Sequence, residues 1–484
     1  MPASRALIAD LCAVIPRGRV LTEPEDLLVH GYDGTWLDQT PDVVVAVTST
    51  EEIAAVLRIA HRHHRPVIPR GGGSGLAGGA VPCSGGIVLS TTLMHRILAL
   101  DAHSLTAVVQ PGVINAALQA AAERHGLFYP PDPASLNQAT IGGNVATSAS
   151  GPRCLKYGGT KDYVIGLEVV LPDGDVVRLG GRSHQPGPDH HLLRLFVGSE
   201  GTLGVISEVT VRLLPKPAAR GTVMAAFDHL EEAGRAVGMI LSGGILPLAL
   251  EMMDRITLRC VEEYLQTGLP TESEAVLLID VDGDETSIPD QLDAVAQACR
   301  SAGATIVKPA SSEEESAQLW RARRSTSSSF GRIRPNKLGE DISVPRSAIP
   351  AMVRAVQEIA ARYNLLIPLF GHIGDGNLHP NILCDLRDTA EMERVARAAR
   401  EIFAEALRLG GTLSGEHGIG LLKRAFVPAS VDSAALALMR QIKRTLDPAN
   451  LLNPGKLLGD MELSPVPTID AGHSAPGFAV SPGS

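Results

Sequence analysis

The sequence is poor in aromatic residues and has neither an excess of positive charge nor a long apolar run. Aromatic side chains make up 3% of its 484 residues, whereas Gly (49) and Pro (33) are frequent, so we expect many tight loops rather than a helical bundle. The formal net charge of -10 argues against a nucleic acid as partner, because such proteins present a basic face. No stretch of about 18 apolar residues occurs, which predicts no transmembrane segment.

The six cysteines are scattered, and none forms a Cys-x-x-Cys pair. Their spacing argues against a zinc ribbon or a disulfide framework and indicates a reducing cytoplasm. We therefore expect a cytoplasmic protein, and peripheral attachment to the inner membrane face stays open. A chain of this length exceeds one ordinary hydrophobic core, so two or three domains are expected.

The first part of the chain is predicted to form a strand–helix–strand unit followed by further strands. We expect a buried strand at 43–47, a helix at 51–61 opened by a capping box at 49–52, and a strand at 66–69. The hairpin turn is expected at 171–175, between two of the later strands, which are 87–90, 106–110, 166–171 and 176–179.

The second part, from about 218 to 420, mixes amphipathic helices with short strands such as 275–280. The pattern breaks at 215–217, where we place a domain boundary. Because helices and strands alternate irregularly, we expect an α+β sheet with helices on one face. The expected helices are 230–241, 291–302, 351–363 and 392–409.

The segment PVIPRGGGSGLAGGAV, residues 66–81, places a dense run of glycines directly after a strand. Its Gly73, Gly75 and Gly78 match G-x-G-x-x-G, the Rossmann dinucleotide fingerprint, which requires a helix to open inside the motif. The residues that follow contain too much glycine and proline for a helix, so this interpretation fails. A main-chain nest for an anion such as a phosphate is the functional alternative, and a flexible loop is the structural one.

Two more glycine-rich segments, 130–151 and 196–215, lie in the same part of the chain. Three such segments in one domain predict a long cofactor that is held largely by main-chain atoms.

Four motifs carry a resemblance to a known family. PRGGGSGLAGG, ATIGGNVATSASG, KYGGTKDYVIGLEVVLPDG and GSEGTLGVISEVTVRLLP occur in this order, and the similarity covers about 38–458. The chain resembles the vanillyl-alcohol oxidase family, which has a PCMH-type FAD-binding domain. Within it the similarity is to the FAD-dependent D-2-hydroxyacid dehydrogenases, a branch with D-lactate dehydrogenases, the glycolate oxidase flavin subunit and D-2-hydroxyglutarate dehydrogenase.

The resemblance implies an α+β fold with a two-subdomain PCMH-type FAD-binding domain at 1–217. An α+β substrate (cap) domain with an antiparallel sheet and a metal site follows at 218–420. A helical segment at 421–458 is expected to return to the FAD domain. Residues 459–484 are rich in Pro, Ser and Gly, and we expect this tail to be disordered.

The resemblance also implies the residues that contact FAD. No histidine lies between Gly71 and Gly79, where some relatives attach FAD covalently, so non-covalent FAD is expected. Ser74 stands where the family often has threonine and keeps the hydroxyl. The implied contacts are Arg70, Gly71, Gly72, Gly73, Ser74, Gly75, Leu76, Pro131, Asp132, Pro133, Ala134, Thr140, Gly142, Gly143, Asn144, Ser150, Gly151, Gly201, Gly204 and Ile206.

A second group of polar residues begins with FGHIGDGNLHPNI, in which His372 and His379 are seven residues apart. On one helix this spacing separates the Cα atoms by roughly 10.5 Å, too far for one metal ion. On one straight strand the two side chains would point to opposite faces. The turn-forming run 374–377 lets the chain reverse and bring the imidazoles together. Two core histidines without a ligand role are the alternative.

The segment GTLSGEHGIG adds Glu416 and His417 in a glycine-flanked loop. A His–His–Glu set is a plausible ligand set for a divalent ion, with Zn expected first and Mn or Fe open. His417, beside a ligand, is a candidate general base. In the family branch, the residues that match His372, His379 and Glu416 bind the metal, and the one that matches His417 removes the proton.

The segment LWRARRSTSSSFGRIRPNKLGEDISVP, residues 319–345, resembles the family's W-x-x-R region. The resemblance assigns Arg323 to the substrate carboxylate, which a planar guanidinium suits, and Asn381 to the substrate. We expect Arg321 to be solvated, and the role of Arg324 stays open. Lys337 is also a candidate for substrate binding. It differs in register from the lysine that binds a second carboxylate in hydroxyglutarate enzymes, which weakens the case for a dicarboxylate without excluding it.

These residues together imply FAD-dependent oxidation of a D-2-hydroxy acid, with D-lactate or glycolate favoured and D-2-hydroxyglutarate as the alternative. Hydride would pass to flavin N5 while His417 acts as base, and a quinone, a cytochrome or a carrier protein would accept the electrons. A homodimer or a subunit of an oxidase complex is left open. A metal-dependent hydrolase would leave the glycine segments unexplained, and a non-enzymatic flavin module would leave Arg323 and His417 unexplained.

Overall fold

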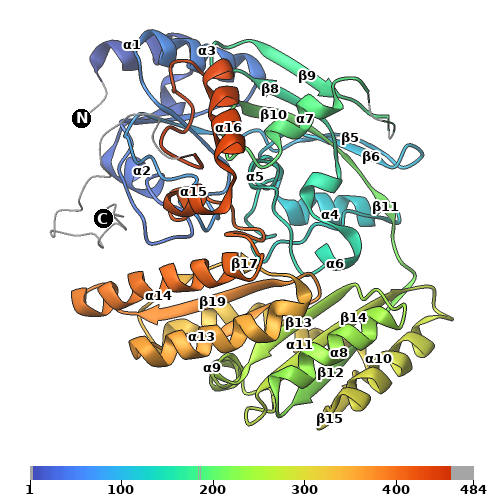
Figure 1. Cartoon of the computed structure of the whole chain (residues 1–484). Coiled ribbons are helices and arrows are strands. Elements are labelled where there is room, and N and C mark those ends of the chain that lie inside the picture. Colours follow the sequence, from blue (N-terminus) through green and yellow to red (C-terminus); the bar gives the residue numbers. More distant parts are fainter. Residues whose placement is uncertain (1–3, 184, 186, 459–484) are drawn as a thin grey trace. The chain divides into compact units, whose positions relative to one another are not determined.

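The computed structural model describes residues 4–183, 185 and 187–458, and it divides into two compact units (Figure 1). Unit 1 consists of the described residues of 1–150, 159–216 and 416–484. Unit 2 consists of 151–158 and 217–415. The expected disordered tail at 459–484 lies outside the described residues. No helix among the described residues has both the length and the apolar character required to cross a bilayer.

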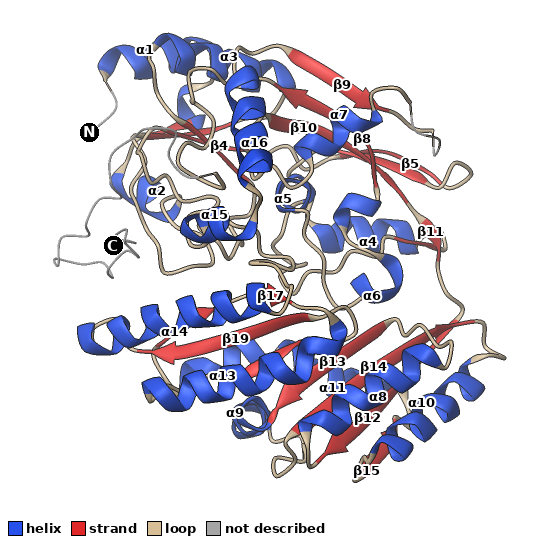
Figure 2. Ribbon diagram, viewed as in Figure 1, coloured by secondary structure: helices blue, strands red, loops and turns tan. Residues whose placement is uncertain are grey.

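Unit 1 has two main sheets with helices packed on them (Figure 2). Its strands are β1 (Val20–Leu21), β2 (Val43–Ala46), β3 (Val67–Arg70), β4 (Ile87–Ser90), β5 (Ile97–Asp101), β6 (Thr106–Val109), β7 (Leu127–Phe128), β8 (Val164–Val170), β9 (Val176–Gly180), β10 (Val205–Arg212) and β11 (Leu214–Pro215). Its α-helices are α1 (Arg5–Val14), α2 (Pro24–Val29), α3 (Thr50–Arg62), α4 (Asn115–Glu123), α5 (Ile141–Thr147), α7 (His190–Phe196), α15 (Val427–Ser430) and α16 (Ser433–Leu446).

The predicted strand–helix–strand unit is confirmed as β2, α3 and β3. Both β2 and β3 pair in parallel with β4, in the order β1-β2-β4-β3. Ser49 caps α3, since its hydroxyl accepts the amide of Glu52 at 3.3 Å. Glu52 does not complete the expected capping box, because its carboxylate accepts the amide of Thr48 at 2.7 Å and pairs with Arg19. The apolar face of α3 packs on these strands in the core of unit 1.

The second sheet of unit 1 is antiparallel, in the order β5-β6-β10-β8-β9. Its β8–β9 hairpin confirms the predicted turn at 171–175. The amide of Leu171 donates to the carbonyl of Asp175 at 2.8 Å, and Gly174 has φ +88°. A positive φ of this size is readily adopted only by glycine, which explains the Asp-Gly signal in the sequence.

Unit 2 is built on one antiparallel sheet in the order β15-β12-β14-β13-β18-β19-β16, with β17 also paired to β19. The strands are β12 (Ala219–Phe227), β13 (Ala249–Asp254), β14 (Ala275–Gly283), β15 (Ile306–Pro309), β16 (Asn336–Gly339), β17 (Ile342–Ser343), β18 (Leu369–His372) and β19 (Asn377–Cys384). The α-helices are α6 (Cys154–Tyr157), α8 (Leu230–Ser242), α9 (Arg255–Leu265), α10 (Ile288–Ala302), α11 (Glu313–Arg324), α12 (Thr326–Ser329), α13 (Ile349–Tyr363) and α14 (Thr389–Arg408).

The expectation that helices cover one face of this sheet is wrong. On β12, Met224 packs with α9 and α11, whereas a side chain at Gly221 would meet Leu292 of α10. These two positions are an odd number of residues apart, so they lie on opposite faces. The physical reason can be seen in β14, which is buried at every position from Ala275 to Asp282, as in a strand covered on both faces.

The β18–β19 hairpin reverses the chain between His372 and Asn377, as the turn-forming residues predicted. Gly376 has φ +88° in this turn. A Cβ atom there would lie 2.1 Å from the carbonyl oxygen of Val344, so the position excludes any side chain. The hairpin therefore depends on glycine for both its backbone conformation and its close packing.

Residues 416–458 belong to unit 1. The expected helical character is confirmed over α15 and α16, whereas most of the remaining segment is irregular. After α16 the chain runs beside β3: the amide of Val67 donates to Leu451 at 2.8 Å, and the amide of Asn453 donates to Val67 at 2.9 Å. This pairing extends the parallel sheet next to the glycine-rich loop.

We predict that Gly376→Ala lowers the free energy of unfolding by about 1–3 kcal/mol, because it forces an unfavourable φ and a steric clash. Gly331→Ala is the control, since a Cβ atom there meets nothing within 4 Å. Chemical denaturation of both variants measures the difference. Equal stability of the two variants would contradict this account of the hairpin.

Candidate active site

One face of the unit 2 sheet carries most of the polar residues predicted for substrate and metal. Cross-strand partners share a face, and the register pairs Phe370 with His379, Asn381 with Gly339, and Lys337 with Leu383. Phe370 and Leu383 pack toward α9 and the chain that follows α12, so this is the face that α9 and α11 cover.

His372 and His379 lie diagonally across the β18–β19 hairpin. Their ring centroids are 5.1 Å apart and the rings are nearly perpendicular, at 87°. Both residues are buried, with 6% and 4% of their surface exposed. The prediction that the turn brings the two imidazoles together is confirmed.

Glu251 on β13 joins two of the predicted residues. Its carboxylate, 0% exposed, lies 2.6 Å from Nδ1 of His372 and 2.5 Å from Nη2 of Arg323. Burial by itself raises the pKa of Glu251, but His372 and Arg323 outweigh this effect and hold the pKa below its usual value. The ionised carboxylate can only accept, so Nδ1 of His372 donates, and in the neutral ring Nε2 carries the lone pair.

Arg323 is fixed at the end of α11 by several contacts. Trp320, one turn earlier, donates from Nε1 to Asp280 at 2.8 Å and anchors the helix on the sheet. The guanidinium of Arg323 lies 4.5 Å from the ring centre of Phe370, a cation–π contact. Its buried Nε has no hydrogen-bond partner among the residues that the structure describes. Arg321 and Arg324 are exposed, and the expectation of a solvated Arg321 is confirmed.

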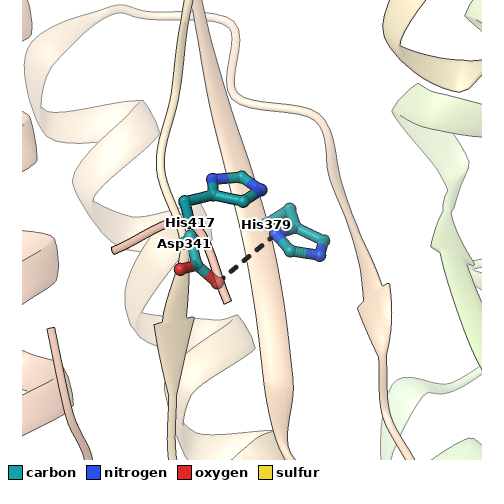
Figure 3. Close-up of side chains that lie close together, drawn as sticks. All are labelled: Asp341, His379 and His417. Carbon is teal, nitrogen blue, oxygen red and sulfur yellow. Dashed lines mark ion pairs between the residues drawn. The ribbon is translucent and has the colours of Figure 1, made fainter. Parts of the chain in front are cut away.

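Asp341 is another buried carboxylate on this face. Figure 3 shows it beside His379, with 3.7 Å between Oδ1 of Asp341 and Nδ1 of His379. Its Oδ1 accepts the side-chain amide of Asn377 at 2.6 Å, and Oδ2 accepts the backbone amide of Gly415 at 2.9 Å. Asp341 is thus close to the imidazole of His379, and it holds the end of the loop that leads to Glu416. His417, the third residue labelled in Figure 3, belongs to unit 1.

Asn381 and Lys337 lie on the same face as His379. The side-chain amide of Asn381 donates to the carbonyl of His379 at 2.8 Å. Lys337 donates to the hydroxyl of Ser327, and its ammonium lies 5.8 Å from the ring centre of Phe330. Burial lowers the pKa of Lys337 to about 8.

In unit 1, the first two glycine-rich segments pack directly against each other. A Cβ atom on Gly71 would lie 2.2 Å from Oγ1 of Thr140, and one on Gly72 would lie 2.2 Å from the carbonyl oxygen of Gln138. In the described segment between β3 and β4 no helix forms, which agrees with the rejection of the Rossmann interpretation. The glycines are required because main chain meets main chain here.

Two buried polar groups beside this loop suit a cofactor with acceptor atoms. Arg70 donates from Nη1 to the carbonyl of Tyr32 at 2.6 Å, and its guanidinium occupies the space where Gly73 would carry a Cβ. The side-chain amide nitrogen of Asn144 is buried without a hydrogen-bond partner among the described residues. A buried donor without a partner is costly, and a cofactor carbonyl or phosphate oxygen would satisfy it. These residues fit FAD.

The other predicted FAD contacts occupy loops and one short helix. Thr140 caps α5, where its hydroxyl accepts the amide of Gly143 at 3.2 Å, and Gly142 and Asn144 lie in the same helix. Ser150 belongs to unit 1 and Gly151 to unit 2. The remaining predicted contacts lie in the loop after β3, in the loop after β7, in the loop before β10 or at the start of β10: Ser74, Gly75, Leu76; Pro131, Asp132, Pro133, Ala134; Gly201, Gly204; Ile206.

The loop with Glu416 and His417 begins where unit 2 ends. Gly415 is the last residue of unit 2, and Glu416 is the first residue of the returning part of unit 1. Oε2 of Glu416 accepts the hydroxyl of Ser150 at 3.1 Å, and Nε2 of His417 lies 4.0 Å from Oε1 of Glu416.

Sequence reasoning missed Glu251 and Asp341. Glu251 left a signal in the sequence, because it is an acidic residue inside the apolar pattern LALEMM at 248–253. Such a residue is buried only when it is paired. The pattern could have marked Glu251 as a polar group of a site, but it could not have named its partners. Asp341 follows Glu340 between two short strands, where no such pattern marks it.

The comparisons with known proteins agree with these observations. Residues 41–180 match the family "FAD binding domain", and residues 216–457 match "FAD linked oxidases, C-terminal domain". The solved structure of p-cresol methylhydroxylase with substrate bound has a TM-score of 0.79 at 18% identity, covering 95% of this chain and 99% of that one. At this identity the likeness shows the fold.

Three curated relatives are similar over most of their length. The glycolate oxidase subunit GlcD of Bacillus subtilis is 45% identical, covering 89% of this chain and 92% of the relative. D-lactate dehydrogenase of Anaerostipes hadrus is 35% identical, with 86% and 89% covered. D-2-hydroxyglutarate dehydrogenase of Xanthomonas citri pv. viticola is 34% identical, with 93% and 96% covered. The chain therefore belongs to the FAD-linked oxidases of the PCMH-type family and is an oxidoreductase that acts on CH–OH donors.

Proposed function

We propose that the protein oxidises a D-2-hydroxy acid, with D-lactate or glycolate favoured, to the corresponding 2-oxo acid. The observation that carries this proposal is the buried Glu251, which holds Arg323 and His372 together on one sheet face. Arg323, a cation suited to a carboxylate, and His372, an imidazole suited to a metal ion, thus lie on neighbouring elements. The relatives act on compounds of this kind according to their names: glycolate, D-lactate and D-2-hydroxyglutarate.

Arg323 is proposed to bind the substrate carboxylate. Its Nη2 is paired with Glu251, whereas its buried Nε has no partner among the described residues and is available to an anion. A charge-assisted hydrogen bond to a carboxylate would satisfy this donor. Glu251 keeps the guanidinium in place. Because its carboxylate balances the positive charge of Arg323, the affinity for the substrate depends on the geometry of Arg323 as well as on its charge.

His372, His379 and Glu416 are proposed to bind a divalent metal ion, with zinc expected first. The chemistry of His372 fits, because a metal-binding histidine commonly donates its other ring nitrogen to a carboxylate, here Glu251. The link to Glu416 is covalent: Gly415, held by Asp341, is bonded to it, so their Cα atoms are about 3.8 Å apart. A bound metal would polarise the substrate hydroxyl and lower its pKa.

His417 is proposed to take the hydroxyl proton. As the neighbour of Glu416 it would be close to a substrate bound at the metal, and the glycines on either side of the pair allow the two side chains to point differently. Bound FAD supplies the two-electron acceptor for the alcohol oxidation. Arg70, Asn144 and the glycine loop after β3 are proposed to hold it without a covalent bond. A quinone, a cytochrome or a carrier protein is proposed as the acceptor from FAD.

D-2-hydroxyglutarate is the alternative substrate, and Lys337 is the residue that bears on it. Lys337 lies on the same sheet face as His379, where a second carboxylate could approach, but its ammonium already donates to Ser327. One hydrogen bond leaves two N–H groups of the ammonium for other acceptors, so the preference for a monocarboxylate rests on the register of Lys337 and not on this contact. A metal-dependent hydrolase is not favoured, because it would have no use for the packed glycine segments of the FAD binding domain.

The purified protein should be yellow and should release FAD on heating or acid treatment. Gly72→Ala should lower the FAD-to-protein ratio, because its Cβ atom would lie 2.2 Å from the carbonyl oxygen of Gln138. Gly79→Ala, in the same loop, meets nothing within 4 Å and should retain FAD. The flavin absorbance of the three proteins measures this. Wild-type protein without flavin that cannot be reconstituted would refute non-covalent FAD binding.

Arg323→Lys should raise KM for the 2-hydroxy acid by on the order of tenfold to a hundredfold while FAD stays bound, because lysine lacks the planar guanidinium. Arg321→Lys is the matched control on the same helix, and its exposed side chain should leave KM unchanged. A dye-linked assay with D-lactate, glycolate and D-2-hydroxyglutarate measures the effect. Equal KM values in both variants would show that the carboxylate is bound elsewhere.

His372→Ala and His379→Ala should lose metal together with turnover. His417→Ala should keep metal and FAD but lose turnover by roughly 10²–10⁴-fold, the usual contribution of a general base. His125→Ala, an exposed residue, is the control. Elemental analysis and the dye-linked assay decide between the roles. Metal loss in His417→Ala with retention in His379→Ala would reverse the assignment of ligand and base.

A further inference from the structure

All three glycine-rich segments of unit 1 contact the short stretch that follows Gly415. Ser150, from the second segment, donates to Glu416 at 3.1 Å. Glu200, from the third, accepts the amides of Ile419 and Gly420, each at 2.7 Å. Ala77, from the first, accepts the amide of Leu421 at 2.8 Å. The stretch 416–421 is thus tied to each segment that is proposed to hold FAD.

Glu200 makes the most constrained of these contacts. It is 7% exposed and has φ +53°, a left-handed conformation that is uncommon for a residue with a side chain. A Cβ atom on Gly418 would lie 2.8 Å from its Oε1, so only glycine permits the loop to approach the carboxylate this closely. The backbone conformation of Glu200 and the position of its carboxylate are therefore both constrained.

Burying a carboxylate is costly unless hydrogen bonds compensate for the lost water. Burial raises the pKa of Glu200, whereas the two amides and the nearby Lys456 and Lys423 oppose that shift. An apolar residue could fill this space without the electrostatic cost. The carboxylate is distinguished by its ability to accept two backbone amides from one loop, which fixes the conformation of that loop.

We propose that Glu200 is a positioning residue that couples FAD binding to metal binding, by tying the flavin-binding loop 198–204 to the stretch that carries Glu416 and His417. This inference rests on the proposed function, in which Glu416 is a ligand and His417 the base. FAD that orders the loop around Glu200 also orders the amides of Ile419 and Gly420. Coupling of this kind is reciprocal, so FAD tightens metal binding and metal tightens FAD binding by the same factor.

The test compares Glu200→Gln with Glu208→Gln. Glutamine keeps the shape of the side chain and one carbonyl oxygen, but its amide group opposes one of the two backbone amides instead of accepting it. Glu208 lies in the same motif, on β10, opposite Glu168 in the strand register, and serves as the matched control. For each protein, the affinity for Zn²⁺ is measured by chelator competition with and without saturating FAD, and amide hydrogen exchange is followed at Ile419 and Gly420.

In wild type and in Glu208→Gln, FAD should tighten Zn²⁺ binding by about 5-fold or more and slow exchange at both amides. In Glu200→Gln, FAD should still bind, but its effect on Zn²⁺ affinity should approach a factor of one. Hydrogen exchange at the two amides should be faster by on the order of tenfold, which corresponds to the loss of one hydrogen bond. If Glu200→Gln fails to fold, the effect of FAD on the Zn²⁺ affinity of the wild type still tests the coupling.

The failures are distinguishable. Zn²⁺ affinity in wild type that is independent of FAD would overturn the coupling and leave the metal assignment intact. Wild type without Zn²⁺ binding, but with FAD-dependent exchange that is lost in Glu200→Gln, would contradict the metal assignment and support the role of Glu200 in ordering the loop. Exchange at Ile419 and Gly420 that is the same in all three proteins would overturn that role.

Discussion

The substrate-facing half of the proposed site depends on the buried carboxylate of Glu251. It accepts from His372 and pairs with Arg323, so a single side chain fixes both an imidazole and a guanidinium. Removing one member of such a buried pair leaves an uncompensated charge, which typically costs about 3–5 kcal/mol. The geometry of the face is therefore set by electrostatic compensation in the interior of unit 2, and β13, β18 and α11 are held together by it.

Unit 1 follows a different physical rule, the close approach of one main chain to another. The glycines after β3 leave room for Gln138 and Thr140, and Gly420 leaves room for Ala77, which its Cβ atom would approach to 2.0 Å. Such contacts cannot accommodate side chains, so they fix three loops against the stretch after Gly415. A cofactor held by these loops would be surrounded by rigid backbone donors, which suits a ligand with several phosphate and carbonyl oxygens.

The local features of this architecture could be predicted from the sequence. The strand–helix–strand unit, the 171–175 turn and the reversal between His372 and His379 all depend on residues close together in the chain. Glycine-rich turns and helix caps have strong local preferences, so short segments specify them. Other expectations were wrong: the carboxylate of Glu52 accepts the amide of Thr48 and does not complete the capping box, and helices cover both faces of the unit 2 sheet, since β14 is buried on both sides.

The sequence by itself determined where the chain turns, which segments must expose bare backbone, and the family resemblance on which the assignment of Arg323 and His372 rests. Only the tertiary structure decided that Glu251 joins those two residues, because the register between β13 and β18 brings it to His372 and the packing of α11 brings Arg323 to it. It likewise decided that Glu200 holds the amides after Gly418. Strand pairing and loop packing between distant segments are cooperative properties of the whole fold, and no local preference encodes them.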